Sequence, residues 1–280
     1  MDHPVPSGWL PLSPCTSACL PAPAVRTGLP QALRLIAVGV VLLTALLALP
    51  FVHPVKHRGR WLRACSQALL RAAGVRLRIT PTSEAGGAVW GGVLVVANHL
   101  SWIDVLALAA VAPMRPLAKH EVARWPPIGR LARCAGALFV DRAGLRAVPA
   151  TVAEITATLR GRDAVVVFPE GTTWCGAAAG PFRRAAFQAA LDAQAPVRPV
   201  AITFWHADGA PARAAAFVGT QSLFDSILRV LRTPGMICEV TVLDDLAPTG
   251  DRRALARRAE AAIARATGVP HRARQPALVG

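Results

Sequence analysis

The sequence lacks the repeated Cys-x-x-Cys pairs that mark many disulfide scaffolds and zinc modules. Its six cysteines include no Cys-x-x-Cys pair, and Cys15 and Cys19 stand by themselves near the N-terminus. A chain of 280 residues does not need a disulfide framework, and the cysteines lack the usual zinc-ligand spacing. We interpret Cys175 as a small loop residue rather than a nucleophile. The cysteines therefore predict neither a disulfide scaffold nor a metal site.

Acidic residues and lysines are also scarce. The chain has 31 basic and 16 acidic residues, a net charge of +15, and only Lys56 and Lys119 among its lysines. We give the arginine excess no functional weight, because the high alanine content indicates coding bias. The composition is 53% hydrophobic. A basic and apolar chain fits an anionic membrane surface better than nucleic acid, for which the sequence carries no motif.

One long stretch, from Leu35 to Val52, carries no charge. Its length of about eighteen residues is near the lower limit for crossing a bilayer. A secretory signal peptide and a buried core helix are the alternatives. The long Pro-rich leader and the lack of a small-residue cleavage site before His53 disfavour a signal peptide. We expect a membrane span or a deep insertion, with residues 1–31 as a disordered leader.

Basic residues are more frequent after this stretch than before it. Arg26 and Arg34 precede it, and Lys56, Arg58, Arg60, Arg63 and Arg71 follow it. The positive-inside rule then places the C-terminal domain on the cytoplasmic side of the cell membrane. The segment from Arg58 to Ala73 reads as a basic amphipathic helix, which either lies on lipid headgroups or packs on its own domain. Residues 32–74 thus form the expected membrane helix plus basic helix.

From Val75 onward, short β-branched runs alternate with longer amphipathic runs. This pattern predicts an α/β domain over residues 75–267, with a mostly parallel central sheet flanked by helices. The expected strands are 76–80, 92–97, 115–118, 136–140, 164–168, 197–203, 214–218 and 236–243. The expected helices are 101–112, 126–134, 146–160, 181–193, 221–232 and 251–267. Residues 268–280 are expected to form a flexible tail.

The strand at 92–97 runs directly into Asn98-His99, with Asp104 five residues after the histidine. On one continuous helix the two side chains would point about 140° apart. They can meet if His99 lies in a turn and Ser101 caps a helix in which Asp104 is the third residue. A carboxylate on one ring nitrogen leaves the other free as a base and stabilises the imidazolium. The alternative is a helix cap beside a satisfied turn histidine.

The chemistry that suits such a base is direct. No Gly-x-Ser-x-Gly motif appears, so a serine hydrolase has no visible nucleophile. The simplest reaction is deprotonation by His99 of a substrate hydroxyl, which then attacks an activated acyl carbonyl without a covalent enzyme intermediate.

A second junction follows the strand at 164–168, where Pro169-Glu170-Gly171-Thr172 begins. Open α/β sheets bind ligands at the carboxyl ends of their strands, and Gly171 and Thr172 offer donors for an anionic group there. Arg142, after a third strand, can hold a phosphate bidentately. The alternative for Arg142 is a surface pair with Asp141.

Four blocks in order carry a family resemblance. They are Asn98-His99-x4-Asp104, Gly136-Ala137-Leu138-Phe139-Val140-Asp141-Arg142, Phe168-Pro169-Glu170-Gly171-Thr172 and Val197-Arg198-Pro199-Val200-Ala201. Over residues 75–245 the chain resembles the PlsC-type lysophospholipid and glycerophosphate acyltransferases.

The resemblance implies roles for residues and partners. His99 is the implied general base and Asp104 its orienting partner. The implied substrate-binding residues are Asn98, Arg142, Glu170, Gly171, Thr172 and, on the acyl-donor side, Pro199. The implied donor is acyl-CoA or acyl carrier protein, without metal or cofactor. The implied acceptor is the sn-2 hydroxyl of lysophosphatidic acid, giving phosphatidic acid in phospholipid biosynthesis at a membrane, with no nucleic-acid partner.

The chain also departs from the family pattern. Thr173 and Trp174 stand where many members carry an Arg or Ser pair, and Ala185 stands where Gly is frequent. These departures leave acyl transfer intact and keep another acceptor, lyso-ornithine lipid, open. A non-catalytic lipid-binding membrane protein and a thioesterase are the rival classes.

Overall fold

The computed structural model describes residues 13–21, 28–52, 58–81, 90–126, 128–140 and 145–271. Within these residues, one sheet has the strand order β1-β7-β6-β2-β5-β3-β4. Its strands are β1 (Val75–Pro81), β2 (Leu94–Ala97), β3 (Arg115–Lys119), β4 (Leu138–Val140), β5 (Val165–Val167), β6 (Val197–Trp205) and β7 (Met236–Val242). Among the described strands only β6 and β7 pair antiparallel. The expected mostly parallel sheet is confirmed.

The two strands that lead into the site lie at the centre of this sheet. Every residue of β2 and of β5 is buried, as continuous runs of valine, leucine and alanine predict for parallel strands covered on both faces. β2 lies between β5 and β6, and Val96 pairs with Val167. The turns after these two strands therefore emerge side by side at one edge of the sheet.

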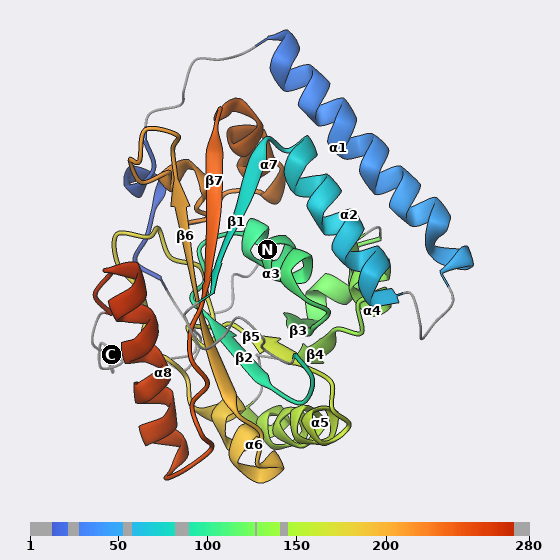
Figure 1. The fold of residues 1–280 in the computed structure, drawn as a ribbon. Coiled ribbons are helices and arrows are strands. Elements are labelled where there is room, and N and C mark those ends of the chain that lie inside the picture. The colour runs from blue at the N-terminus through green and yellow to red at the C-terminus, as the bar shows by residue number, and fades with distance from the viewer. Residues whose placement is uncertain are drawn as a thin grey trace, which may run out of the picture.

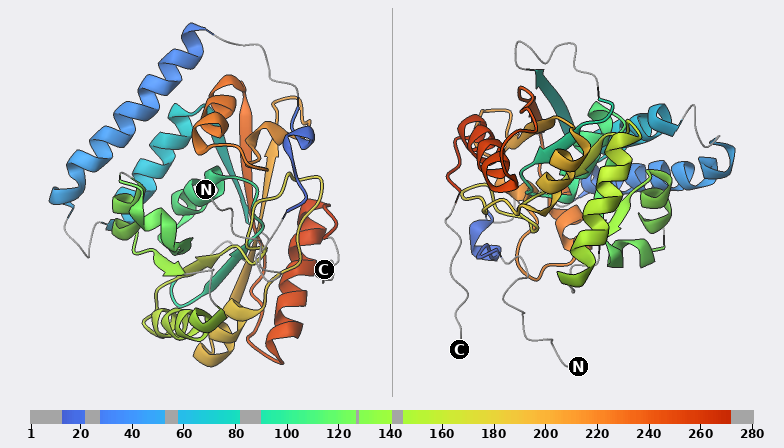
Figure 2. Two further views of the ribbon diagram at one scale, coloured as in Figure 1. Left: turned by 180° about the vertical axis from the view of Figure 1, so that it is seen from behind. Right: turned by 90° about the horizontal axis from the view of Figure 1, so that it is seen from below.

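Helices cover both faces of the sheet (Figures 1 and 2). On one side lie α1 (Leu29–Ala48), α2 (Arg58–Ala72), α3 (Trp102–Val111) and α7 (Leu223–Arg232). On the other lie α5 (Val148–Arg160), α6 (Ala185–Ala193) and α8 (Arg252–Thr267), while α4 (Ile128–Cys134) follows β3. Short 3-10 helices span Ser17–Cys19, Leu49–Phe51, His120–Arg124, Leu145–Ala147 and Arg213–Ala215. A separate apolar core lies on each side of the sheet.

Helix α1 lies along the outside of the molecule, over α2 (Figure 1). Leu29–Phe51 is long and apolar enough to cross a membrane, with a mean hydropathy of 2.5. The Arg34 guanidinium donates to the carbonyl of Leu231, at 2.9 Å, and so ties α1 to α7. The large apolar side chains that α1 exposes recur every three or four residues, on one stripe. The stripe consists of Leu29, Leu33, Ile36, Val40, Leu43 and Leu47, and Leu35 is also exposed beside it.

The strand expected at 214–218 is wrong. Arg213–Ala215 instead forms a 3-10 turn in which Ala214 and Ala215 are buried in the core. Alanine has little preference for strands, so the packing of an alanine-rich apolar run can favour a turn instead. The amide of Phe217 donates to the carbonyl of Leu100 at 2.8 Å, which holds this segment against the turn after β2.

The two ends of the described chain also differ from expectation. Residues 13–21 are not a loose leader, because Cys15 is buried against Trp174 and Val218. At the other end, Pro270 accepts a hydrogen bond from the Ala179 amide, and His271 Nδ1 lies 2.6 Å from the Gly180 carbonyl oxygen. The expected tail therefore packs on the domain as far as residue 271. These contacts join segments far apart in the sequence, which local composition does not reveal.

Candidate active site

His99 lies in the turn between β2 and α3, held by an acid from the helix that follows. Its Nδ1 is 2.8 Å from Oδ2 of Asp104, a side chain with no exposed surface. Ser101 caps α3, and Asp104 in the first turn completes a capping box. The predicted meeting of His99 with Asp104 is therefore confirmed, through the predicted cap.

One oxygen of Asp104 receives three donors. Besides the ring of His99, Oδ2 accepts from the amides of Leu100 at 2.6 Å and Ser101 at 2.8 Å. The other oxygen, Oδ1, is buried and has no partner among the described residues. Three donors fix the carboxylate, and a fixed carboxylate keeps the ring proton on Nδ1. The ring nitrogen left for a substrate is then Nε2.

The imidazole also packs against the second junction. It stacks on the ring of Phe168, with 4.0 Å between centroids and 16° between planes. The His99 side chain keeps 20% of its surface exposed. The ring is therefore restrained on one face and at Nδ1, yet it remains accessible.

Asn98 joins β2 to β6 where their regular pairing ends. Its Nδ2 donates to the carbonyl of Ile202, and its Oδ1 accepts from the amide of Ile202, both at 2.8 Å. The side chain is buried. Asn98 thereby joins the turn that carries His99 to β6, and both its amide oxygen and its amide nitrogen are already engaged within the protein.

Glu170 ties the turn after β5 to the turn after β2. Its Oε2 accepts from the His99 amide at 2.6 Å, and its Oε1 accepts from the Gly180 amide at 2.9 Å. Burial raises the pKa of this carboxyl to about 8, although the hydrogen bonds from Gly180 and His99 lower it. Gly171 then reverses the chain at a φ of 77°. Glu170 positions the backbone of His99 from inside the protein.

A cavity of about 120 Å³ lies beside His99. Its lining is largely apolar and comes from β6, from the loop after β5 and from the end of α8. Lining residues include Trp174, Cys175, Ala179, Phe204, Trp205, Arg213, Val269 and His271. Trp174 connects this wall to the turn after β2, because its amide donates to the carbonyl of His99 at 2.8 Å. An apolar cavity next to an accessible imidazole suits a substrate with a hydrocarbon chain.

The other residues that the sequence implicates are placed differently. Arg142 lies outside the described residues. Pro199 is buried within β6, opposite Val96, and does not line the cavity. Thr172 is partly buried and does not line it either. The structure thus brings together Asn98, His99, Asp104 and Glu170.

Sequence reasoning missed several residues of the cavity wall. Arg213 is exposed and directly precedes the segment at 214–218 that was expected to be a strand. In the sequence, Trp174 is distinctive only as a departure from the family pattern, and that departure does not predict its place in the cavity wall. His271 lies in the expected tail, and no local signal marks it. These side chains reach the site through loops whose course depends on contacts between distant segments.

Comparison with known proteins agrees with this architecture. The Acyltransferase family matches residues 75–203. A lyso-ornithine lipid O-acyltransferase from Pseudomonas aeruginosa is 35% identical over 76% of this chain and 79% of its own length. A 1-acyl-sn-glycerol-3-phosphate acyltransferase from Neisseria gonorrhoeae is 36% identical over 55% of this chain and 59% of its own length.

The fold has a solved counterpart. The crystal structure of the 1-acyl-sn-glycerophosphate acyltransferase PlsC from Thermotoga maritima superposes with a TM-score of 0.60 at 19% identity. The match covers 84% of this chain and 96% of that one. With the turn geometry, the family match and the extended similarity to the Pseudomonas enzyme in agreement, the chain belongs to the PlsC-type acyltransferase family.

Proposed function

We propose that the protein transfers a fatty acyl group from a thioester to the free hydroxyl of a lyso-lipid, with His99 as general base. The observation that carries this proposal is the imidazole whose Nδ1 contacts buried Asp104 while the ring stays accessible beside an apolar cavity. A histidine that only stabilised the start of α3 would not need a side chain that is 20% exposed beside a cavity.

The reaction follows from that arrangement. Nε2 of His99 takes the proton of the acceptor hydroxyl as its oxygen attacks the thioester carbonyl. The new ester C–O bond forms, the tetrahedral intermediate collapses, and the C–S bond breaks. The imidazolium returns its proton to the departing thiolate of coenzyme A or carrier protein. Asp104 stabilises the imidazolium between these two steps.

The first acceptor we propose is lysophosphatidic acid, acylated at sn-2 to phosphatidic acid. Its phosphate needs cationic partners. Arg142 is the candidate from the family blocks, and Arg213 is the exposed arginine on the cavity wall. Gly171 and Thr172 lie at the neighbouring turn. Pro199 does not line the cavity, and we propose that it acts on the acyl-donor side indirectly, by shaping strand β6.

A second acceptor, lyso-ornithine lipid, is favoured by a specific observation. The Pseudomonas enzyme that matches most of this chain is named for that substrate. In the loop after β5, Thr173 Oγ1 donates to the Phe217 carbonyl, and Trp174 is buried against Gly180. Neither position supplies the cation that many family members carry there. A headgroup less dependent on phosphate contacts fits that loop.

Membrane association supports a lipid acceptor. The exposed apolar stripe of α1 suits insertion into the lipid, and the basic helix α2 lies beside it. We propose that α1 anchors the protein and that the catalytic domain faces the cytoplasm, where the acyl donors are made.

The test is an acceptor panel with the purified full chain in mixed micelles. One acyl-CoA and one acyl carrier protein are offered as donors to lysophosphatidic acid and lyso-ornithine lipid, and products are identified by mass. We expect a single acylated lipid, absent with His99→Ala. Free fatty acid as the main product would show a thioesterase. Lipid binding without turnover would show a binding protein. Either result would contradict the proposal.

A further inference from the structure

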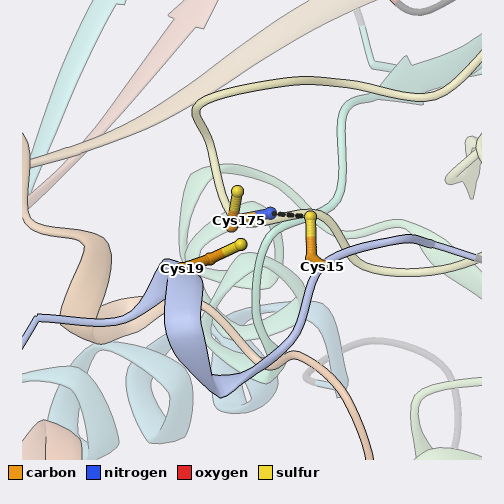
Figure 3. A group of neighbouring side chains, drawn as sticks. All are labelled: Cys15, Cys19 and Cys175. Carbon is orange, nitrogen blue, oxygen red and sulfur yellow. Dashed lines mark hydrogen bonds between the residues drawn. The ribbon is translucent and has the colours of Figure 1, made fainter.

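Three cysteines from distant parts of the sequence meet beside the catalytic loop (Figure 3). Cys15 precedes a short 3-10 helix near the N-terminus, Cys19 is the last residue of that helix, and Cys175 follows Trp174 in the loop after β5. Their sulfur atoms all lie within 4.8 Å of one another. Cys15 and Cys175 are buried and Cys19 is partly exposed.

The spacing of the three sulfurs suits a metal ion. Thiolates bound to one zinc ion at about 2.3 Å are held roughly 3.8 Å apart in tetrahedral geometry, so only a small contraction of this cluster is needed. A disulfide would join two of the cysteines and leave the third without a role. Three residues separate Cys15 from Cys19, which is within the spacing of paired zinc ligands, so the expectation from the sequence that the cysteines lack zinc-ligand spacing is wrong for this pair.

The backbone around the cluster favours a thiolate. The amide of Cys175 donates to Sγ of Cys15 at 3.3 Å. A neutral thiol is a weak acceptor, whereas amide hydrogen bonds to sulfur are typical of metal-bound thiolates. The neighbours are apolar, including Trp174, Ala216 and Val218. Such a shell limits solvent access and strengthens the attraction between a cation and its thiolates.

We propose that Cys15, Cys19 and Cys175 bind one thiophilic metal ion of the zinc class through three thiolates. A tetrahedral ion would keep its fourth position for water or an added ligand, on the side that partly exposed Cys19 leaves open. The sequence contains no Cys-x-x-Cys pair, and Cys15 and Cys19 alone do not predict a zinc site. The third ligand comes from the loop after β5, so only the folded chain assembles the set.

The ion would fasten the N-terminal segment to the catalytic loop. Cys175 directly follows Trp174, whose amide donates to the carbonyl of His99. Metal binding at Cys175 therefore restrains the wall behind the base without contacting substrate. The metal ion would have a structural role, because it would hold the loop after β5 in position. This role does not depend on which lipid is acylated.

Cobalt binding tests the proposal directly. The reduced, metal-free full chain is titrated with Co²⁺, and absorption from thiolate-to-cobalt charge transfer is recorded. We expect saturation at one equivalent and displacement by Zn²⁺. Cys19→Ser is the main variant because this side chain is partly exposed while Cys15 and Cys175 are buried, and Cys15→Ser and Cys175→Ser follow. Cys65→Ser, also partly exposed, is the matched control.

Each outcome decides the matter. Loss or marked weakening of the cobalt band in all three cluster variants, with Cys65→Ser unchanged, supports the site. Alkylation mapped by peptide mass should agree, with Zn²⁺ slowing modification of Cys19 and not of Cys65. No thiolate band in the unaltered protein would overturn the proposal. So would a band that survives in Cys19→Ser, or a disulfide within the cluster that forms in preference to metal binding.

Discussion

The replacement Asp104→Asn separates the role of the carboxylate from that of the helix cap. A hydrogen bond to a charged group contributes about 1.5–3 kcal/mol and a neutral one about 0.5–1.5 kcal/mol. Replacing the carboxylate by a neutral amide therefore weakens the hydrogen bond to His99 by about 1–2 kcal/mol. Because this bond is strongest when His99 is an imidazolium, the activation free energy rises, and kcat falls about 10-fold. If the new amide turns its N–H toward the ring, the wrong tautomer results, and the loss extends toward about 10⁴-fold.

The same replacement weakens the bonds from the Leu100 and Ser101 amides. We therefore expect the free energy of unfolding to fall by about 1–2 kcal/mol, with the fold retained. The assay is acyl transfer with saturating donor, alongside urea unfolding. Asp225→Asn is the matched control, since Asp225 holds the same position after the cap Ser222 in α7 but contacts no histidine. Equal kcat values for the Asp104 variant and this control would refute the reasoning.

Three further changes test the supports of the site. Burial raises the pKa of Glu170 to about 8, so its protonation stabilises the fold below about pH 4.5, and this contribution is lost as the pH rises through about 8. The stability lead of the wild type over Glu170→Gln should shrink between about pH 5 and pH 8 in urea unfolding, and a lead that grows over this range would contradict the assignment. In Gly180→Ala the new Cβ would lie 2.5 Å from the indole nitrogen of Trp174. We expect a loss of about 1–3 kcal/mol in unfolding free energy and a raised KM. Gly39→Ala, where the Cβ meets nothing within 4 Å, should show neither change. Ile36 is 61% exposed on α1, and Ile36→Asp should lower binding to anionic vesicles in flotation about 10-fold or more, with unchanged unfolding. Equal flotation would show that α1 does not insert.

Much of the fold could be predicted because its signals are local. The continuous apolar runs of β2 and β5 and the cap at Ser101 depend on neighbouring residues, and the contact between His99 and Asp104 follows from that cap. The predicted strand at 214–218 failed because packing turned an alanine-rich run that has no strong preference of its own.

The remainder of the site depends on contacts between distant segments. Glu170 was expected to bind substrate, yet both of its oxygens are engaged with backbone amides of His99 and Gly180. His271 lines the cavity, and Cys15 packs against the cavity residues Trp174 and Cys175, although both come from segments that were expected to be loose. The two segments are short and polar or proline-rich, so their composition does not predict a fixed structure. Their contacts with the folded domain hold them in place.

The central claim is that His99 removes the proton of the acceptor hydroxyl. The most direct measurement is the turnover of acyl-CoA by purified His99→Ala with the acceptor identified in the panel, compared with the unaltered protein and with unfolding curves for both. The account predicts a loss of about 10²-fold to 10⁴-fold in kcat with the fold retained. Acyl transfer within a few-fold of the unaltered protein would contradict it.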